Sequence, residues 1–335
     1  MVAKHRKPRI LFFYLHLSSF VDRDLSILKR HYDVRVGNID ITLKKPIESV
    51  RTFLKFMRDM LWCDLTYSWF AIEHAYWAVM FSKIFFKKSL VVVGGYEVAK
   101  VPEINYGALL NPIRARKIIW TMNHADLVCA VSEFNRREIL RATRDANVKC
   151  IHNAVDPDEF VPASYKKAII VTVGIADRET AIRKGVFDLI EVGNSLPEYE
   201  FVIIGRADGD LLAELKSKSK SNVRIIENMP DEELRRTLAS AKVYCQLSSY
   251  ESFGVALIEA MSCNCIPVVT DRGALPEVVG DAGFVVPLGD RHALADAIKK
   301  ALKDASIEPR RRVVERFSMK KREEELLAAI NQLMG

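Results

Sequence analysis

Short apolar runs rich in β-branched and aromatic residues alternate along the whole chain with longer stretches whose apolar residues recur at helical spacing. Such runs are typical of buried parallel strands, and the stretches between them are typical of connecting helices. We therefore predict an α/β fold built on parallel sheets. Twelve strands are expected, at residues 10–14, 33–36, 65–68, 90–93, 127–131, 149–152, 169–173, 200–204, 222–226, 243–247, 266–270 and 283–286.

The chain of 335 residues is too long for one ordinary hydrophobic core. Each half supplies six strands, which is enough for a doubly wound, Rossmann-like sheet. An aperiodic stretch with proline and aspartate at 154–166 is interpreted as the linker, and the active cleft is expected between the two sheets. We predict a first domain at 1–155, a second at 156–318 and a C-terminal helix at 319–335 that packs on either domain.

Composition excludes an integral membrane protein, because 28% of the residues are charged and no apolar run approaches the roughly 18 residues of a span. The basic, apolar N-terminus has no small-residue cleavage site, so it is interpreted as the first strand and not as a secretory signal. The six cysteines form no CxxC pair, which favours reduced thiols and argues against structural zinc. These features together predict a cytoplasmic protein.

The net charge of +7 is unevenly distributed. Residues 1–160 hold 25 Lys and Arg against 17 Asp and Glu, a balance of +8, whereas the remainder holds 25 against 26, a balance of −1. This asymmetry predicts that the first half meets something anionic. Nucleic acid is the weaker interpretation, because no RNA-recognition, zinc-finger or helix-turn-helix signature is present. A nicotinamide dehydrogenase is also disfavoured, since no strand leads into GxGxxG.

A predicted helix at 47–62 carries apolar residues on one face and Arg51, Lys55 and Arg58 on the other. Its apolar face is formed by Ile47, Val50, Phe53, Leu54, Met57 and Leu61. Such a helix either packs its apolar face on the core or lies on anionic lipid. Both interpretations stay open at this stage, and the second would place the protein on the inner face of the membrane.

The segment Tyr250–Gly280 is the most informative for chemistry. Ser252 is expected to cap a helix whose free N–H groups could hold a diphosphate, and Gly254 would let a ligand approach them. Glu251 and Glu259 would lie about 10 Å apart along that helix, a spacing that suits the two ends of one elongated ligand. Two glutamates alone are more often solvated, but Glu259 falls in an otherwise apolar helix and needs a partner.

This segment resembles the E-x7-E region of the retaining glycosyltransferases of family 4, the glycosyl transferases group 1, which have the GT-B fold. Four other segments continue the resemblance in the expected order, namely AVSEFNRREI, IHNAVDPDEF, VTVGIADRETAIRKGVFDLIEV and FVIIG. The resemblance is strong over about residues 126–305. It implies two Rossmann-like domains facing a cleft, a C-terminal helix that crosses back to the first domain, and transfer of a hexose from a nucleoside diphosphate sugar without a metal or other cofactor.

The resemblance also implies roles for individual residues. Glu259 would bind the ribose hydroxyls, and Glu251 would hold the donor sugar. Lys184 would neutralise the departing diphosphate, whose charge grows as the glycosidic bond breaks, and Arg183 or Arg178 would supply a second cation. The remaining donor-site residues are expected in loops around the sugar, the diphosphate and the base: Ser252, Phe253, Gly254, Val255, Gly174, Gly205 and Met229.

Three departures from the family pattern concern the loops. Ile175 follows Gly174 where the family usually has arginine. The first domain lacks the usual histidine, and there Gly95 permits close approach while Tyr96 or Glu97 could contact the sugar; a tight structural turn explains this loop equally well. The first loop lacks a Gly-Gly pair, and Ser18 is the candidate donor in its place.

Two Asp-x-Asp triplets, at 22–24 and 156–158, are assigned to a helix start and to the linker, so no metal site is expected. The acceptor is expected to be a lipid phosphate, another anionic molecule or a glycan. The alternative is a GT-B protein that binds or epimerises a nucleotide sugar without transferring it.

Overall fold

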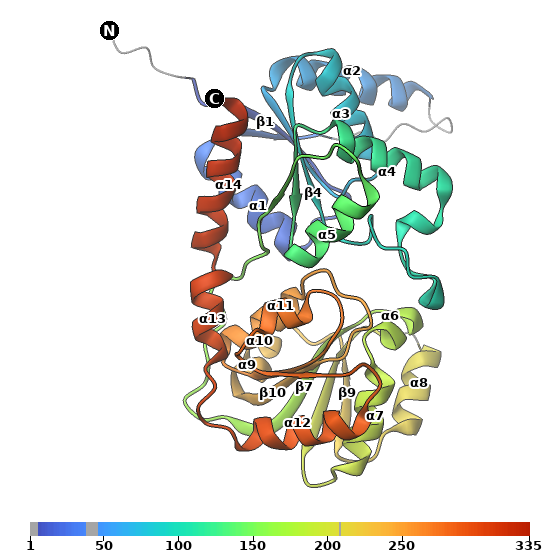
Figure 1. The fold of residues 1–335 in the computed structure, drawn as a ribbon, viewed down its shortest axis with the longest axis vertical. Helices are drawn as coiled ribbons and strands as arrows, with labels where there is room; N and C mark the ends of the chain where they lie inside the picture. The colour runs from blue at the N-terminus through green and yellow to red at the C-terminus, as the bar shows by residue number, and fades with distance from the viewer. Residues whose placement is uncertain (1–5, 38–45, 208) are drawn as a thin grey trace. The chain divides into compact units, whose positions relative to one another are not determined.

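The computed structural model describes residues 6–37, 46–207 and 209–335 (Figure 1). The chain forms two compact units: residues 1–152 with 322–335, and residues 153–321. Each unit contains one six-stranded sheet in which every neighbouring pair of strands is parallel. All twelve predicted strands are present, and their ends differ from the prediction by at most two residues.

The first unit has the strand order β2-β1-β3-β4-β5-β6. Its strands are β1 (Arg9–Phe13), β2 (Asp33–Val36), β3 (Leu65–Trp69), β4 (Lys88–Val93), β5 (Leu127–Ala130) and β6 (Val148–Cys150). Its helices are α1 (Ser19–His31), α2 (Pro46–Trp62), α3 (Glu73–Ile84), α4 (Pro112–His124), α5 (Glu133–Ala142) and α14 (Met319–Met334), with short turns η1 (Pro102–Ile104) and η2 (Ala108–Leu110).

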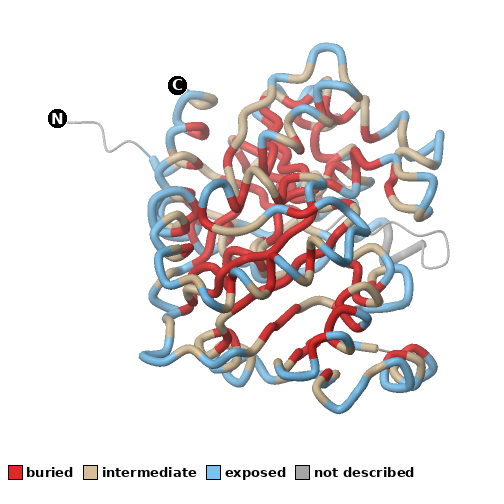
Figure 2. The backbone as a smooth tube through the Cα atoms, turned by 60° about the horizontal axis from the view of Figure 1, so that its bottom comes forward, coloured by how far each residue is buried: buried red, intermediate tan, exposed pale blue. Residues whose placement is uncertain are grey.

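Alternating residues of these strands face opposite sides of the sheet. Leu11 and Phe13 of β1 pack with α2 and α3, and the neighbouring cluster against β4 and β5 adds α4 and α5. On the opposite face, Phe12 stacks on Tyr67, and α1 and α14 provide the cover. The buried positions run along β1, β3, β4 and β5, and Figure 2 shows the buried residues in the interior of the tube with exposed residues around them.

The second unit has the strand order β12-β11-β10-β7-β8-β9. Its strands are β7 (Lys167–Ile175), β8 (Glu200–Gly205), β9 (Val223–Glu227), β10 (Ala241–Gln246), β11 (Ile266–Thr270) and β12 (Phe284–Val286). Its helices are α6 (Arg178–Arg183), α7 (Val186–Ser195), α8 (Gly209–Lys218), α9 (Asp231–Ser240), α10 (Val255–Ser262), α11 (Leu275–Val279), α12 (Arg291–Lys303) and α13 (Pro309–Arg316). One face is covered by α7, α8 and α12, and the other by α9, α10 and α11 (Figure 1).

Both sheets reverse their strand order at one point, between β1 and β3 in the first unit and between β7 and β10 in the second. The loops that leave the carboxyl ends of these strands diverge to opposite faces and leave a crevice, which is where open α/β sheets bind ligands. The topology therefore gives each unit one favoured ligand position.

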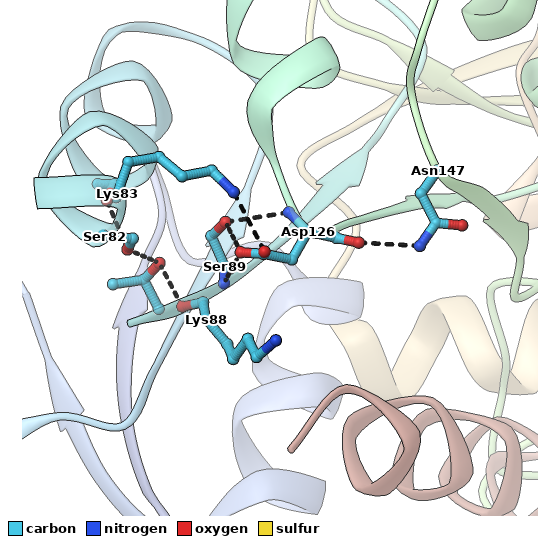
Figure 3. A network of polar contacts seen from close by, with 8 residues as sticks. Ser82, Lys83, Lys88, Ser89, Asp126 and Asn147 are labelled. Carbon is cyan, nitrogen blue, oxygen red and sulfur yellow. Dashed lines mark hydrogen bonds and ion pairs between the residues drawn. The ribbon is translucent and has the colours of Figure 1, made fainter. Parts of the chain in front are cut away.

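A polar network lies at the opposite end of the first sheet, where β4 and β5 begin (Figure 3). Asp126 accepts hydrogen bonds from the backbone N–H and the hydroxyl of Ser89, at 2.9 and 2.8 Å. Lys83 pairs with the same carboxylate at 3.1 Å, and Asn147 donates to the Asp126 carbonyl. Lys83, counted in the positive balance of this unit, is thus neutralised locally.

The structure corrects the predicted faces of α2. Phe56 and Met60 are its buried apolar residues, because they reach Leu11 and Phe13 of β1. Four residues of the predicted apolar face are exposed, namely Val50, Phe53, Leu54 and Leu61. Ile47 lies outside the residues whose side chains are described.

Candidate functional site

The reversal point of the second sheet brings together the loops after β7 and β10, which carry most of the predicted donor-site residues. The first loop runs from Gly174 through α6 to Lys184, and the second contains Glu251. Ser249 of the second loop donates its backbone N–H to the Arg183 carbonyl at 2.8 Å, and Arg183 Nη1 donates to the Tyr250 carbonyl at 3.1 Å. Arg183 therefore joins the two loops.

Lys184 is held over the end of β7. Its ammonium donates to the Val173 carbonyl at 3.4 Å, and a Cβ at Gly174, where φ is +113°, would lie 2.2 Å from the Lys184 Nζ. A side chain at this position would thus displace the lysine. Burial lowers the pKa of Lys184, Glu251 opposes that shift and Arg183 adds to it. The ammonium is a cation partly removed from water, and it lies within electrostatic reach of a carboxylate.

Glu251 is oriented by neighbours on two sides. Gln246 Nε2 donates to Glu251 Oε2 at 2.8 Å, and the Glu251 carbonyl accepts the Ala274 N–H at 2.8 Å. Gly273 is necessary at this contact, because its φ is +62° and a Cβ there would lie 2.2 Å from the Glu251 carbonyl oxygen. The end of β10 and the loop after β11 are therefore locked together beside the carboxylate.

Tyr244 of β10 links the two predicted glutamates. Burial raises the pKa of its phenol well above the usual range, and the charges of Glu259 and Glu251 raise it further. The Tyr244 hydroxyl donates to Gln246 Oε1 at 3.5 Å. Both glutamates thus act on Tyr244, and Glu251 acts on Lys184 as well. Sequence reasoning missed Tyr244 and Gln246, because nothing in the sequence separates them from ordinary buried strand residues.

The helix that carries Glu259 begins at a glycine. Gly254, at φ +97°, is the N-cap of α10, and its carbonyl accepts the N–H groups of Leu257 and Ile258. The prediction that Ser252 caps this helix is wrong, because the chain turns two residues later, at the position that needs a positive φ. Ser252 and Phe253 are buried, and Phe253 packs edge-on against Phe317 at 5.5 Å. Val255 is the first helical residue, and its N–H belongs to the turn that lacks intrahelical partners.

The remaining predicted residues of this unit lie around the loops after β7, β8 and β9. Arg178 pairs with Glu214 of α8 and lies over the Phe187 ring. Gly205 is required where β8 ends, because a Cβ there would lie 2.5 Å from the backbone nitrogen and oxygen of Ile175. Met229 is half-buried and accepts a contact of 3.6 Å from the Thr237 hydroxyl. The roles proposed for these residues stay predictions.

The glycine loop of the first unit is organised by Glu97. This carboxylate is 1% exposed and accepts the N–H groups of Ala71, Gly94 and Gly95 at 3.1, 3.1 and 2.9 Å. Burial raises the pKa of Glu97, and the three donors oppose that shift. Glu97 thus has a structural task, whereas Tyr96 is 45% exposed and packs edge-on against Tyr106.

Ser18 lies at the start of α1, where its backbone has N-cap geometry but its side chain makes no capping hydrogen bond. Its hydroxyl oxygen is buried and has no hydrogen-bond partner within the part of the chain that the structure describes. A buried hydroxyl without a partner is costly, so its expected use as a donor to a ligand remains a prediction.

Comparison with known proteins agrees with this geometry. Residues 158–322 match the family described as Glycosyl transferases group 1. The O-antigen chain mannosyltransferase B of Escherichia coli is 30% identical over 207 residues, covering 56% of this chain and 54% of that protein. A phosphatidyl-myo-inositol mannosyltransferase of Mycolicibacterium smegmatis is 32% identical over 185 residues, covering 52% and 48%. The matches span about half the length of these relatives.

Solved structures share the fold of the whole chain. HepE of Anabaena, solved in complex with UDP, superposes with a TM-score of 0.77 at 17% identity, covering 97% of this chain and 100% of that one. Sucrose-phosphate synthase of Thermosynechococcus elongatus gives a TM-score of 0.76 at 16% identity, covering 98% and 99%. At these identities the likeness establishes the fold, which is that of the GT-B glycosyltransferases.

Proposed function

Because residues 158–322 belong to the glycosyl transferases group 1 and the whole chain has the GT-B fold, we propose that this protein transfers a sugar from a nucleoside diphosphate sugar to an acceptor. The observation that carries the proposal is the position of Lys184 over the end of β7, within electrostatic reach of Glu251, which Gln246 at the end of β10 holds in place. A partly buried cation near one carboxylate, with Glu259 as a second carboxylate on the helix that follows, suits a ligand that is anionic in its middle and rich in hydroxyls at both ends.

In the proposed reaction, Lys184 and the first N–H groups of α10 receive the diphosphate. As the glycosidic bond breaks, negative charge accumulates on the departing phosphate, and a fixed cation stabilises that charge more in the transition state than in the ground state. Glu259 orients the ribose and Glu251 the transferred sugar. We propose that the departing phosphate deprotonates the acceptor on the same face, which retains the anomeric configuration.

We further propose that the reaction needs no divalent metal. Among the described residues, no three histidine, cysteine, aspartate or glutamate side chains are grouped so as to hold a metal ion. Lys184 supplies positive charge in the place where a metal would otherwise neutralise the phosphates. Turnover that persists after EDTA treatment is the expected result, and restoration of lost turnover by added Mg²⁺ would contradict it.

The first unit is proposed to receive the acceptor and to contact an anionic membrane from the cytoplasmic side. No described helix is both long enough and apolar enough to cross a bilayer. On α2, however, exposed Val50, Leu54 and Leu61 alternate with exposed basic residues, Arg51, Lys55 and Arg58. Apolar side chains interleaved with cations are typical of helices that lie on anionic lipid.

Ile175 gives a reason to keep the alternative of a nucleotide-sugar binder that transfers nothing. It stands where the family usually has arginine, and it is 4% exposed in the core of the second unit. The position therefore offers no second cation. Release of nucleoside diphosphate from the donor in the presence of acceptor extracts would exclude this alternative.

The direct test of the donor site is a thermal-shift screen with UDP, GDP and ADP and their sugars. A specific donor stabilises the native protein in proportion to the logarithm of its excess over the dissociation constant. Glu259→Gln should remove most of this stabilisation. Glu200→Gln, on an exposed ion pair with Arg224 at the amino end of β8, should leave it intact. Equal donor stabilisation in all three proteins would contradict the proposed site.

A further inference from the structure

A hollow of about 400 Å³ opens at the carboxyl edge of the first sheet. It lies at the reversal point between β1 and β3, where the loops after β1, β3 and β4 meet α4. Its lining is mostly apolar and includes Leu15, Phe70, Ile72, Ala108 and Ile118. The volume is in the range of small-molecule sites, and the position is the one that the topology favours for a ligand.

Contacts within the protein hold the wall of the hollow in place. Phe70 has φ +71°, a conformation that a bulky residue adopts only when its surroundings impose it. Its ring stacks on His16 at 5.7 Å and occupies the space beside Gly94, where a Cβ would lie 2.7 Å from the ring. The Glu97 carboxylate holds the next residue, Ala71, to the glycine loop. Phe70 is therefore fixed as an apolar wall.

The rim carries two cations and further apolar side chains. Arg114 and Lys117 both line the hollow, and they lie three residues apart on α4, hence on the same helix face. The lining also holds two carboxylates, Glu73 and Glu97, of which Glu97 is occupied by backbone N–H groups. His16 and Tyr96 are further titratable residues of the lining. Leu15 is 63% exposed at this rim, so the cations border an uncovered apolar surface.

We propose that this hollow receives the apolar part of an amphiphilic acceptor whose anionic group pairs with Arg114 and Lys117. An apolar lining contributes little binding free energy to a glycan or a free anion. It favours hydrocarbon, because contact removes apolar surface on both sides from water. The two cations recognise a phosphate or carboxylate next to that hydrocarbon. The acceptor role rests on the proposed function, but occupation of the hollow by such a molecule does not.

Calorimetric titration with decyl phosphate below its micelle concentration tests the binding. Decyl glucoside, which has the alkyl chain without the charge, and inorganic phosphate, which has the charge without the chain, are the comparison probes. Decyl phosphate should bind at least about tenfold more tightly than either. Arg114→Gln with Lys117→Gln should lower its affinity about tenfold and weaken its salt dependence. Arg116→Gln, an exposed residue of the same helix outside the lining, is the matched control and should change neither.

A second pair of variants tests the apolar part without touching the core. Leu15→Trp should fill the mouth of the hollow and weaken decyl phosphate binding, while Leu17→Trp, 53% exposed in the same loop and outside the lining, should not. Equal affinity for all three probes, or equal losses in the control variants, would overturn the proposal. If decyl phosphate binds but the protein turns over no donor, the hollow is supported as a binding site and the proposed transfer is refuted.

Discussion

Lys184 is the residue at which a demand of catalysis conflicts with stability. Its ammonium is partly buried, which lowers its pKa, and Glu251 compensates only in part. Lys184→Met keeps the length of the side chain and removes the charge. We expect the melting temperature of the free protein to stay the same or rise, because a buried charge is removed. Sugar transfer should lose about 2–4 kcal/mol of transition-state stabilisation.

The matched control is Lys167→Met, at the exposed start of the same strand, β7. It removes an equal charge far along the strand from Gly174, and it should change neither melting temperature nor turnover. Melting curves and donor turnover measured on all three proteins decide the matter. A Lys184→Met protein that melts early and turns over normally would reverse the assignment of this lysine.

The lowered pKa of Lys184 also predicts proton uptake on donor binding. In the free protein, the ammonium loses its proton at a pH below its ordinary value of 10.5. A bound diphosphate favours the charged form and raises that pKa again. Between the two pKa values, binding must draw a proton from the buffer, and the uptake should vanish at any pH low enough for the lysine to be charged in both states.

Titration of UDP and GDP at a series of alkaline pH values below 10.5, in two buffers of different ionisation enthalpy, measures this uptake. The part of the buffer dependence that comes from Lys184 should fall away as the pH is lowered. Lys184→Met should abolish the dependence. Uptake that persists in this variant would assign the proton to another group.

At the scale of the element, a buried ion pair fastens the last helix to α1, which covers the first sheet. Arg322 of α14 donates to both oxygens of Asp24, at 2.6 and 2.7 Å, and to the carbonyls of Ile151 and His152. Tyr67 donates to the same carboxylate at 2.6 Å. Arg322 is 4% exposed and Asp24 is fully buried, so neither charge has water as an alternative partner.

Removing one partner of this pair should cost more than removing both. Arg322→Met leaves the Asp24 charge buried without its cation and should lower the free energy of unfolding by about 3–5 kcal/mol, while adding Asp24→Asn should recover part of the loss. Glu323→Gln, which breaks only the neighbouring surface pairs with Arg30 and His31, should cost about 0–1 kcal/mol. Denaturant unfolding gives all three values, and additive losses would argue against a coupled pair.

Most strands were predictable because a strand buried on both faces must be apolar throughout, and this pattern is visible locally. The inner face of α2 was not, because two apolar sets share that helix and only β1 decides that Phe56 and Met60 are the buried ones. The structural task of Glu97 was not visible in the sequence for a similar reason, and its expected contact with the sugar stays a prediction. Its partners, Ala71 and the glycine loop, meet only when β3 and β4 pair.

In the donor site, too, some residues could be named from the sequence and others could not. Lys184, Glu251 and Glu259 could be named from spacing and resemblance because each lies in a short motif next to β7 or β10, and their roles stay predictions. Tyr244 was not predictable, since its exposure to the charges of both glutamates depends on the course of β10 in the folded sheet. The hollow of the first unit was also missed, because its lining comes from four separate loops and helices.

At the scale of the whole molecule, charge and exposed apolar surface coincide on one unit. Residues 1–160 carry a balance of +8, and α2 exposes apolar side chains among its cations. Each basic residue near an anionic surface contributes about 1 kcal/mol, an attraction that salt screens over about 10 Å. We therefore expect the protein to sediment with phosphatidylcholine vesicles that contain phosphatidylglycerol, to do so less at high salt, and to ignore pure phosphatidylcholine.

The apolar contribution to this binding is tested by Leu54→Glu with Leu61→Glu, which replaces two exposed leucines of α2 without reaching the core. The matched control is Val314→Glu, an apolar residue of α13 that is 47% exposed in the other unit. Vesicle binding should fall steeply in the first variant and persist in the second, because Leu54 and Leu61 lie among the basic residues of the proposed contact helix and Val314 does not. Binding that both variants retain would show that charge alone holds the protein to the vesicle, and loss in both would place the contact elsewhere than α2.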